Sequence, residues 1–391
     1  MSSREPRRTL IFAGGGTGGH VFPLVAVADA VRALDPGVEL LFVGTERGLE
    51  ARAVPERGYA LELMRVLPLR GGGVSGFVRG VAQAARSLPA GRALVRRVQP
   101  AAVLSVGGYA AGPVSLAGWS LGVPLALLEP NSVIGLANRL VAPLAGRAYT
   151  AFPEADRYFR RGRVLRAGVP LRPGFEPVPY RAPSGRVKLL VLGGSQGART
   201  LNEAVPRAIA TLGEKVEVVH QCGRAHAERV EKLYAELGAA TARVVPFIDD
   251  MPRAIAEAEL VIGRSGAGAV SEICAVGRPS LLVPYPYAAG DHQRHNAEAL
   301  VRAGAAASVL DAQATPERLA REIARLIADP AALAGMASAA RAEGRPEAAR
   351  AIALDLLEFA GLRAASLARA ATAAPTNVDE RTLPLSAEKA V

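Results

Sequence analysis

The chain has 391 residues, 50% hydrophobic and 21% charged, which is the composition of a globular protein with room for two domains. Its net charge of +11 indicates an anionic partner: nucleic acid, an anionic membrane surface or a phosphorylated substrate. Aromatic residues make up only 5%, and no stacking motif alternates with the basic residues, which argues against nucleic acid.

Two further features bear on the compartment. Cys222 and Cys274 have neither CxxC nor metal-ligand spacing, so we expect two buried, reduced thiols and no metal site. No long apolar segment follows the basic N-terminus, and no run of 18 apolar residues occurs anywhere. We therefore expect neither an export signal nor a membrane-spanning helix.

The chain opens with a strand–loop–helix pattern over residues 9–23, TLIFAGGGTGGHVFP. Glycines let backbone amides approach a ligand closely, and the helix that follows directs its positive end at the same point. This turn is therefore predicted to bind phosphate or another anion. The spacing of Gly14, Gly16 and Gly19 also fits the dinucleotide fingerprint, which is weak evidence alone. His20 places a group that titrates near neutrality beside the predicted anion site.

The α/β alternation continues through the first half of the chain. Strands are predicted at residues 39–44, 61–69, 101–106 and 125–128. Residues 74–98 form a basic amphipathic segment, which suits either an anionic lipid surface or a core-facing helix with a solvated basic face. Glu129 and Asn131 follow the strand at 125–128, at the end of a parallel strand where ligands bind, although either also suits a helix cap.

The second half restarts the same pattern. Residues 147–172 are basic and rich in turns, and residues 173–185 contain four prolines without periodicity, which indicates a connection between domains. A strand at 187–192 then leads into a second glycine turn, residues 193–199, whose amides suit a diphosphate. Further strands are predicted at 216–221, 242–247, 260–263 and 279–284, with helices over most of 296–362.

Two acidic features in this half have alternative interpretations. Glu272 lies one to two turns into a helix after a glycine turn, where a carboxylate accepts ribose hydroxyls or merely complements the helix dipole. Asp249 and Asp250 resemble a metal-binding acidic pair, but their position predicts the start of a helix instead.

Eight stretches, in order, resemble the bacterial GT-B glycosyltransferases of peptidoglycan synthesis. The resemblance covers about residues 8–360, and the stretches read GGGTGGHVFP, SVGGYAAGP, LEPNSVIGLANR, GVPLR, LGGSQGAR, PFIDDM, RSGAGAVSEICAVGRPSLLVPYP and DHQRHNA. The resemblance implies an α/β fold of two Rossmann-like domains whose parallel sheets face a central cleft. Residues 1–165, completed by a C-terminal helix at about 346–363, would bind the acceptor and the membrane. Residues 166–345 would bind the UDP-sugar, and 364–391 would form a disordered tail.

The resemblance also implies an inverting transfer of GlcNAc from UDP-GlcNAc to the 4-hydroxyl of undecaprenyl-diphosphate-linked MurNAc-pentapeptide, without metal or cofactor. For the donor it implies that Arg172 and Ser195 contact the diphosphate, Glu272 the ribose, the backbone near Ile248 the uracil, and Asn131 and Gln293 the GlcNAc hydroxyls. For the acceptor diphosphate it implies a turn made of Gly14, Gly15, Gly16, Thr17, Gly18 and Gly19. His20 is the candidate general base and Glu129 its rival.

The resemblance further implies peripheral attachment to the cytoplasmic face of the bacterial inner membrane, with other cell-wall synthesis proteins as partners. The chain departs from the family pattern at three positions. Leu128 and Pro130 replace polar residues on either side of Glu129 and are expected to remove polar groups beside the donor sugar. Val169 replaces an asparagine in the loop before Arg172.

Three other functions explain part of the pattern. A nicotinamide oxidoreductase needs an acid after the second strand, where only Glu46 is available, and leaves the second glycine turn unexplained. Another UDP-sugar enzyme, such as a glycolipid glucosyltransferase or a sugar epimerase, would share the fold. A basic scaffold that recruits lipid precursors without turnover would fit the charge and residues 74–98.

Overall fold

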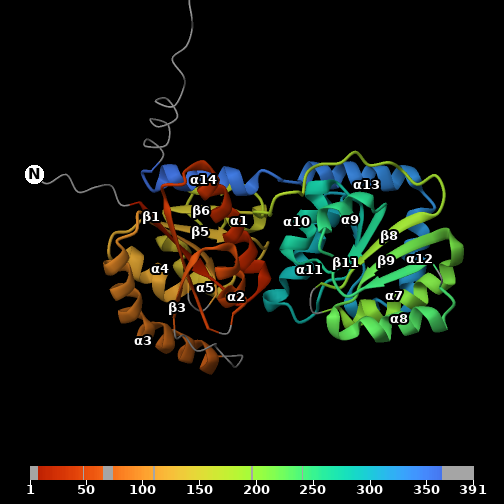
Figure 1. Ribbon diagram of the computed structural model, residues 1–391, viewed down its shortest axis with the longest axis horizontal. Coiled ribbons are helices and arrows are strands. Elements are labelled where there is room, and N and C mark those ends of the chain that lie inside the picture. The colour runs from red at the N-terminus through yellow and green to blue at the C-terminus, as the bar shows by residue number, and fades with distance from the viewer. Residues whose placement is uncertain are drawn as a thin grey trace, which may run out of the picture.

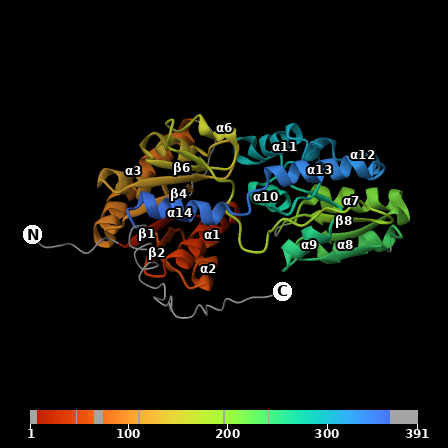
Figure 2. The same cartoon turned by 90° about the horizontal axis from the view of Figure 1, so that it is seen from above.

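The computed structural model describes residues 8–46, 48–64, 74–108, 111–194, 197–239 and 241–362, with the backbone alone for 74–85 and 136. These residues form two α/β domains side by side, each built on a parallel sheet (Figures 1 and 2). The predicted fold class, two Rossmann-like domains, is confirmed.

The first sheet has the strand order β3-β2-β1-β4-β5-β6-β7. Its strands are β1 (Thr9–Gly14), β2 (Glu39–Gly44), β3 (Ala60–Leu63), β4 (Ala102–Gly107), β5 (Leu125–Glu129), β6 (Arg147–Thr150) and β7 (Val164–Arg166). Its helices are α1 (Gly18–Leu34), α2 (Glu50–Ala53), α3 (Val74–Val98), α4 (Ala111–Ser120), α5 (Leu136–Val141) and α6 (Pro153–Asp156).

The second sheet has the strand order β10-β9-β8-β11-β12-β13. Its strands are β8 (Val187–Leu192), β9 (Val216–Gln221), β10 (Ala242–Val245), β11 (Leu260–Gly263), β12 (Ser280–Leu282) and β13 (Ala306–Ser308). The remaining helices are α7 (Arg199–Leu212), α8 (Ala227–Glu236), α9 (Met251–Glu257), α10 (Ala267–Val276), α11 (His292–Arg302), α12 (Pro316–Ile327), α13 (Pro330–Glu343) and α14 (Ala348–Phe359).

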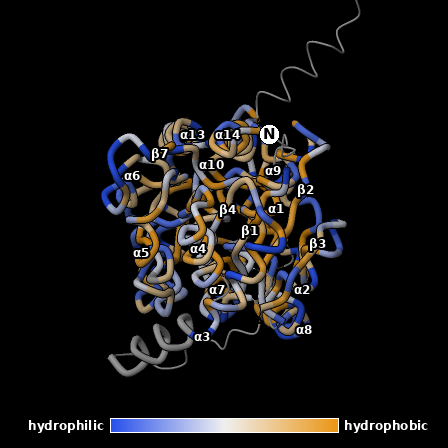
Figure 3. Tube along the Cα trace, turned by 90° about the vertical axis from the view of Figure 1, so that its left-hand side faces the viewer, coloured by the Kyte–Doolittle hydropathy of each residue, from blue (hydrophilic) through white to orange (hydrophobic). Residues whose placement is uncertain are grey.

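The inner strands β1, β4 and β5 of the first sheet are buried on both faces, which is why they read as mostly apolar runs. Along β1, Leu10 and Phe12 join one hydrophobic cluster, while Ile11 and Ala13 join another on the opposite face. In Figure 3 hydrophobic segments run through the inside of the molecule, and hydrophilic segments lie mainly on its outside. The predicted strand at 39–44 matches β2, and that at 187–192 matches β8.

Three short strands were not predicted. β6 and β7 lie within residues 147–172, which the sequence assigned to turns, and β13 lies within the region assigned to helices. Each has only three or four residues, and arginines occupy the ends of β6 and β7, so the apolar signal is too short to read. The strand predicted at 61–69 is β3, which ends at Leu63; residues 65–73 lie outside the described residues.

The last helix, α14, returns to the first domain (Figure 2). Its residues Ile352 and Leu356 are fully buried in the same cluster as Leu10 and Phe12. Asp355 accepts hydrogen bonds from Arg147 Nε at 2.7 Å and from the Tyr149 hydroxyl at 2.9 Å, both in β6. The chain therefore crosses between the domains twice.

Within the described ranges, no single helix has the length and apolar composition needed to cross a bilayer. A bent pair, Pro316–Ile327 followed by Pro330–Phe359, meets that length and composition only when the two parts are taken together.

Candidate active site

The predicted site residues that the structure describes lie in loops after the strands of both sheets or in the helices that follow these loops. Ligands of parallel α/β folds bind at the carboxyl ends of strands. These loops contact one another across the two domains. Asn296 in α11 accepts hydrogen bonds from the Ser132 amide at 3.1 Å and the Ser132 hydroxyl at 2.8 Å. Its own amide donates to the Ser265 carbonyl at 3.2 Å. All three residues are buried, so the loop after β5, the loop after β11 and α11 are fixed relative to one another.

The first glycine turn divides into a buried part and an exposed part. Gly14 and Gly15 are buried, whereas Gly16, Thr17 and Gly19 are exposed. Gly16 has φ +95°, a conformation that favours glycine. Its amide donates to Glu50 at 2.8 Å and so points inward. Helix α1 begins at Gly18 without a side-chain cap. The His20 and Val21 amides donate to the Thr17 carbonyl at 3.1 Å, and an uncapped helix start of this kind suits an anion.

His20, in the first turn of α1, is held by this same loop. Its Nδ1 lies 3.3 Å from the Gly15 carbonyl oxygen. Because a carbonyl only accepts, Nδ1 carries the proton, and Nε2 keeps the basic lone pair. Burial lowers the pKa of His20, the hydrogen bond to Gly15 partly restores it, and the nearby His292 of α11 lowers it again. His20 is thus a neutral imidazole near pH 7, as a general base must be.

Glu129 is placed differently. Its carboxylate is 2% exposed and accepts hydrogen bonds from the Asn131 amide, the Asn131 side chain, Gly135 and Asn138, at 3.1 to 3.3 Å. Burial raises the pKa of Glu129 despite these hydrogen bonds. The carboxylate therefore organises the loop that carries Asn131, and its oxygens face protein donors. The geometry favours His20 over Glu129 as the base.

The three residues that depart from the family pattern, Leu128, Pro130 and Val169, are all buried. Leu128 is fully buried in the cluster with Phe12 and Tyr149, because successive residues of β5 point to opposite faces of the sheet. The expectation that residue 128 stands beside the donor sugar is therefore wrong. Pro130 is also buried. Val169 packs with Leu171 in the core cluster of the second domain, where an apolar side chain fits.

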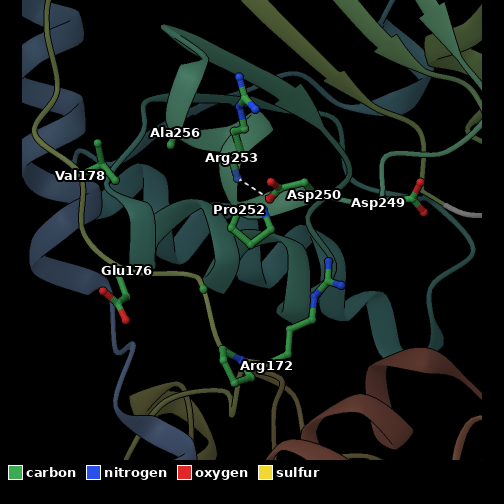
Figure 4. A pocket seen from close by; sticks show the side chains of 10 residues that line it. Arg172, Glu176, Val178, Asp249, Asp250, Pro252, Arg253 and Ala256 are labelled. Carbon is green, nitrogen blue, oxygen red and sulfur yellow. Dashed lines mark hydrogen bonds between the residues drawn. The ribbon is translucent and has the colours of Figure 1, made fainter. Parts of the chain in front are cut away.

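Among the residues predicted to bind the donor, Arg172 lies on the connection between the sheets and lines an open cavity of about 810 Å³ (Figure 4). Its guanidinium lies 5.4 Å from the centre of the Phe175 ring. Across the cavity, the Asp250 side chain caps α9 by accepting from the Arg253 amide at 3.1 Å. This confirms that the acidic pair begins a helix. Of the residues lining the cavity, only Arg172 belongs to the predicted site.

Glu272 lies in α10 near Arg172. Burial raises the pKa of Glu272 to about 7, and the charge of Arg172 partly opposes that shift. Glu272 is therefore a carboxylate whose ionisation changes near neutral pH.

Gln293 is directed toward the start of the same helix. Its Oε1 accepts from the Tyr285 amide at 3.0 Å, and its Nε2 faces Gly266, the residue before α10. The Ile248 amide donates to the buried side chain of Gln221 at 3.1 Å, so that amide is already used. Ser195 lies outside the described residues. The structure thus brings Arg172, Glu272 and Gln293 to one region, with Asn131 in the loop that Asn296 holds beside it.

Sequence reasoning missed three residues that organise the site. Ser132 and Asn296 lie in the quoted LEPNSVIGLANR and DHQRHNA stretches but were not singled out. Glu50 had no signal, since it is one of two acids in TERGLEAR. Among the described residues, no group of three or more His, Cys, Asp or Glu side chains is placed to hold a metal ion.

Comparison with known proteins finds relatives over both domains. The glycosyltransferase family 28 N-terminal domain matches residues 10–150, and the family 28 C-terminal domain matches residues 188–352. A protein of Sorangium cellulosum is 58% identical over 358 residues, 90% of this chain and 88% of that protein. One of Nitrosococcus oceani is 46% identical over 90% of this chain and 99% of its own. Both are named UDP-N-acetylglucosamine–N-acetylmuramyl-(pentapeptide) pyrophosphoryl-undecaprenol N-acetylglucosamine transferase.

Solved structures agree. The crystal structure of Acinetobacter baumannii MurG aligns with a TM-score of 0.75 at 31% identity, over 90% of this chain and 99% of that one. A UDP-GlcNAc 2-epimerase from Neisseria meningitidis, bound to UDP-GlcNAc, aligns with a TM-score of 0.62 over 90% of this chain and 99% of its own. Its 12% identity shows the fold alone.

Proposed function

The chain belongs to the family of UDP-N-acetylglucosamine–N-acetylmuramyl-(pentapeptide) pyrophosphoryl-undecaprenol N-acetylglucosamine transferases, and we propose that its two domains hold donor and acceptor on opposite sides of the cleft. The enzyme moves GlcNAc from UDP-GlcNAc to the 4-hydroxyl of the MurNAc-pentapeptide on undecaprenyl diphosphate, converting lipid I to lipid II in peptidoglycan synthesis. The residue roles below are part of the proposal.

The observation that carries the mechanism is the fixed orientation of His20. Its Nδ1 is bound to the Gly15 carbonyl at the start of α1, and no residue within the described ranges forms a hydrogen bond with its Nε2 beside the exposed glycine turn. Nε2 takes the proton of the muramyl 4-hydroxyl while that oxygen attacks the anomeric carbon from the face opposite UDP. The bond from that carbon to the UDP oxygen breaks, the configuration inverts, and the leaving diphosphate keeps the electron pair.

The acceptor diphosphate binds at the turn formed by residues 14–19. Gly16, Thr17 and Gly19 are exposed there, and the α1 amides and helix dipole point at the anion. Gly14 and Gly15 contribute by shaping the turn rather than by contact.

The donor binds to the second domain. Arg172 meets the charge of the leaving UDP, together with Ser195, and Glu272 accepts hydrogen bonds from the ribose hydroxyls. Gln293 and Asn131 hold the GlcNAc hydroxyls from the two sides of the contact that Asn296 makes with Ser132. The uracil is bound by the backbone around Ile248, through groups other than the amide that donates to Gln221.

Attachment to the membrane is proposed for the cytoplasmic face of the inner membrane, where the lipid tail of the acceptor lies. Helix α3 lies on the outer side of the first domain (Figure 1), and Arg86 and Arg96 are exposed on it. Arg92 is partly exposed and donates to Ser120 at 2.7 Å. A cluster of this kind binds anionic headgroups.

The test measures transfer of labelled GlcNAc from UDP to a polyprenyl-diphosphate muramyl-peptide acceptor, in the presence of EDTA. We expect turnover by the wild type, and a loss of about 10²- to 10⁴-fold in kcat for His20→Ala with UDP binding unchanged. Glu129→Gln provides the comparison, with a smaller loss in kcat. Absence of transfer by a wild type that still binds UDP would indicate a different UDP-sugar enzyme, which competition by UDP-glucose would reveal, or a scaffold.

A further inference from the structure

One buried carboxylate beside the first glycine turn has no role in the proposed transfer. Glu50, the first residue of α2, is 1% exposed. Its carboxylate accepts three hydrogen bonds: from the Gly16 amide at 2.8 Å, from the Thr45 amide at 2.8 Å and from the Thr45 hydroxyl at 2.9 Å. No Lys or Arg among the described residues forms an ion pair with it. This buried carboxylate is therefore held by hydrogen bonds rather than by an ion pair, and burying a carboxylate without a cation beside it costs free energy.

The surroundings of Glu50 are built to admit it. A Cβ placed on Gly15, Gly44 or Gly48 would lie 2.0 to 2.3 Å from atoms of the Glu50 side chain. Any other residue at these three positions would push the carboxylate away from the turn. Glycines from the first glycine turn, the end of β2 and the loop after β2 therefore form the pocket in which the carboxylate lies.

The position of Glu50 relative to His20 is the decisive observation. Glu50 binds the N–H of Gly16, and His20 Nδ1 binds the C=O of Gly15. These two groups belong to one and the same peptide group, which is planar and trans, so its N–H and C=O point in opposite directions. Glu50 thus lies on one side of this peptide group and His20 on the other. A carboxylate that accepts from the N–H polarises the peptide and makes its carbonyl a stronger acceptor.

We propose that Glu50 is the positioning residue of His20 and acts through the Gly15–Gly16 peptide group. The arrangement performs the task of the carboxylate in a Ser-His-Asp triad, which fixes the tautomer of the imidazole and stabilises the imidazolium formed in the reaction, but with a peptide group interposed. When Nε2 takes the acceptor proton, the positive charge on His20 is stabilised by the negative charge of Glu50. The inference rests on the proposed function, because it assigns His20 as the base.

The charged and titratable groups that act on His20 are Glu50 from α2 and His292 from α11. The charge of Glu50 raises the pKa of His20, whereas burial and His292 lower it. Removing the charge of Glu50 therefore lowers the pKa of His20. The rate of a reaction that needs neutral His20 falls as the pH drops through this pKa, so that limb of the pH profile moves to lower pH.

Two substitutions separate the charge from the shape. Glu50→Gln keeps the size but turns one oxygen into a donor that must face the Gly16 or the Thr45 amide. We expect a loss of about 10²-fold in kcat, as for a misplacement of about 1 Å, an acid limb at lower pH and an unchanged KM for UDP-GlcNAc. Glu50→Asp keeps the charge but shortens the side chain. We therefore expect a lower kcat with the acid limb of the pH profile unmoved. Asp35→Asn is the matched control: Asp35 is buried, pairs with Arg8 in the same domain and should affect stability alone.

A second readout needs no turnover. The titration of His20 is followed by NMR of histidine-labelled protein, with its signal assigned by His20→Gln among the five histidines. Glu50→Gln should move this titration to lower pH.

A folded Glu50→Gln protein whose kcat is within twofold of the wild type, or whose His20 titration is unmoved, would overturn the inference. If Glu50→Gln does not fold, Glu50→Asp decides: a wild-type kcat overturns the inference and a lower kcat with an unmoved limb supports it. Failure of the wild type to transfer GlcNAc would instead refute the proposed function, while the NMR titration would still test the link to Glu50.

Discussion

Asn202 fixes the tautomer of His220 beneath the second glycine turn. The Asn202 side-chain amide donates to the Cys222 carbonyl at 2.9 Å, so its oxygen faces His220 Nε2 at 3.2 Å, and this nitrogen carries the proton. His220 Nδ1 then accepts from the Tyr234 hydroxyl at 3.0 Å. His220 is fully buried, and burial lowers the pKa of His220 to about 3.

This histidine should make the second domain sensitive to acid. The unfolded chain binds a proton at His220 near pH 6.5, but the folded domain binds it only near pH 3. The stabilisation that depends on a neutral His220 is therefore complete above pH 6.5. As the pH falls toward 3, the unfolding free energy drops by at most about 1.4 kcal/mol per pH unit. His220→Gln can keep both hydrogen bonds without titrating. From pH 7 to pH 4.5 the unfolding free energy measured in urea should fall by about 2.5 kcal/mol more for the wild type than for this variant. Equal changes in the two proteins would contradict the assignment.

The affinity for UDP should depend on the ionisation of Glu272. Because the pKa of Glu272 is raised to about 7, the carboxylate forms as the pH rises from 6 to 8. A charged acceptor binds a ribose hydroxyl more strongly than a neutral one by about 1 kcal/mol, or about fivefold in Kd. Calorimetry should show the Kd for UDP falling over this range in the wild type relative to Glu272→Gln. The ratio of the two Kd values at each pH removes the effect of phosphate titration, which both proteins share. Parallel pH profiles for the two proteins would argue against a ribose contact.

Helix α14 should depend on Asp355 for its attachment to the first domain. Asp355→Ala leaves the buried Tyr149 hydroxyl and the Arg147 guanidinium without their partner. We expect a loss of about 2 to 3 kcal/mol in the unfolding free energy of this domain. The control is Glu56→Ala, which breaks an exposed ion pair with Arg52 and should cost less than about 1 kcal/mol. Equal losses for the two variants would mean that the Asp355 contacts contribute little.

Membrane binding should depend on charge in α3. Replacing Arg86, Arg92 and Arg96 by glutamine removes about 1 kcal/mol of attraction per residue near the surface, so binding to phosphatidylglycerol vesicles should fall at least about tenfold. Added salt should weaken the wild type in the same way. The matched control replaces three exposed arginines of α12 in the other domain, Arg318, Arg321 and Arg325. If the α3 variant sediments with the vesicles as the wild type does, α3 does not bind the membrane surface.

The buried contact between the domains gives a further prediction. Asn296→Ala leaves the Ser132 amide and hydroxyl and the Ser265 carbonyl unsatisfied, which should cost about 2 kcal/mol and raise the KM for UDP-GlcNAc, because α11 also carries Gln293. Arg302→Ala breaks an exposed ion pair to Glu154 across the same boundary and should leave KM unchanged. A wild-type KM for Asn296→Ala would show that this contact does not position the donor site.

The fold could be read from the sequence because most strands are buried on both faces and each is followed by a turn and a helix. Strands such as β5 therefore stand out as apolar runs of the right length. Short strands such as β13 are held by their neighbours in the sheet rather than by their own residues, and no local pattern marks them.

The site could be read only in part, for a similar reason. His20 follows an unusual run of glycines and draws attention, whereas Glu50 resembles any surface acid in its sequence context. What distinguishes Glu50 is its hydrogen bond to the Gly16 amide, 34 positions earlier, which forms only in the folded chain. Leu128 shows the opposite error: the polar residue that the family pattern has at this position suggested a place beside the sugar, but the strand directs Leu128 into the core, on the face opposite to Glu129.

The return of α14 to the first sheet has a consequence for biosynthesis. One face of that sheet, with Leu10 and Phe12, is covered in part by Ile352 and Leu356, which are translated more than 300 residues later. The second domain, whose strands and packing helices all lie between β8 and α13, is complete before α14 leaves the ribosome. The domain synthesised first is thus the one finished last, and until then its uncovered apolar face is the part of the nascent chain that most needs a chaperone.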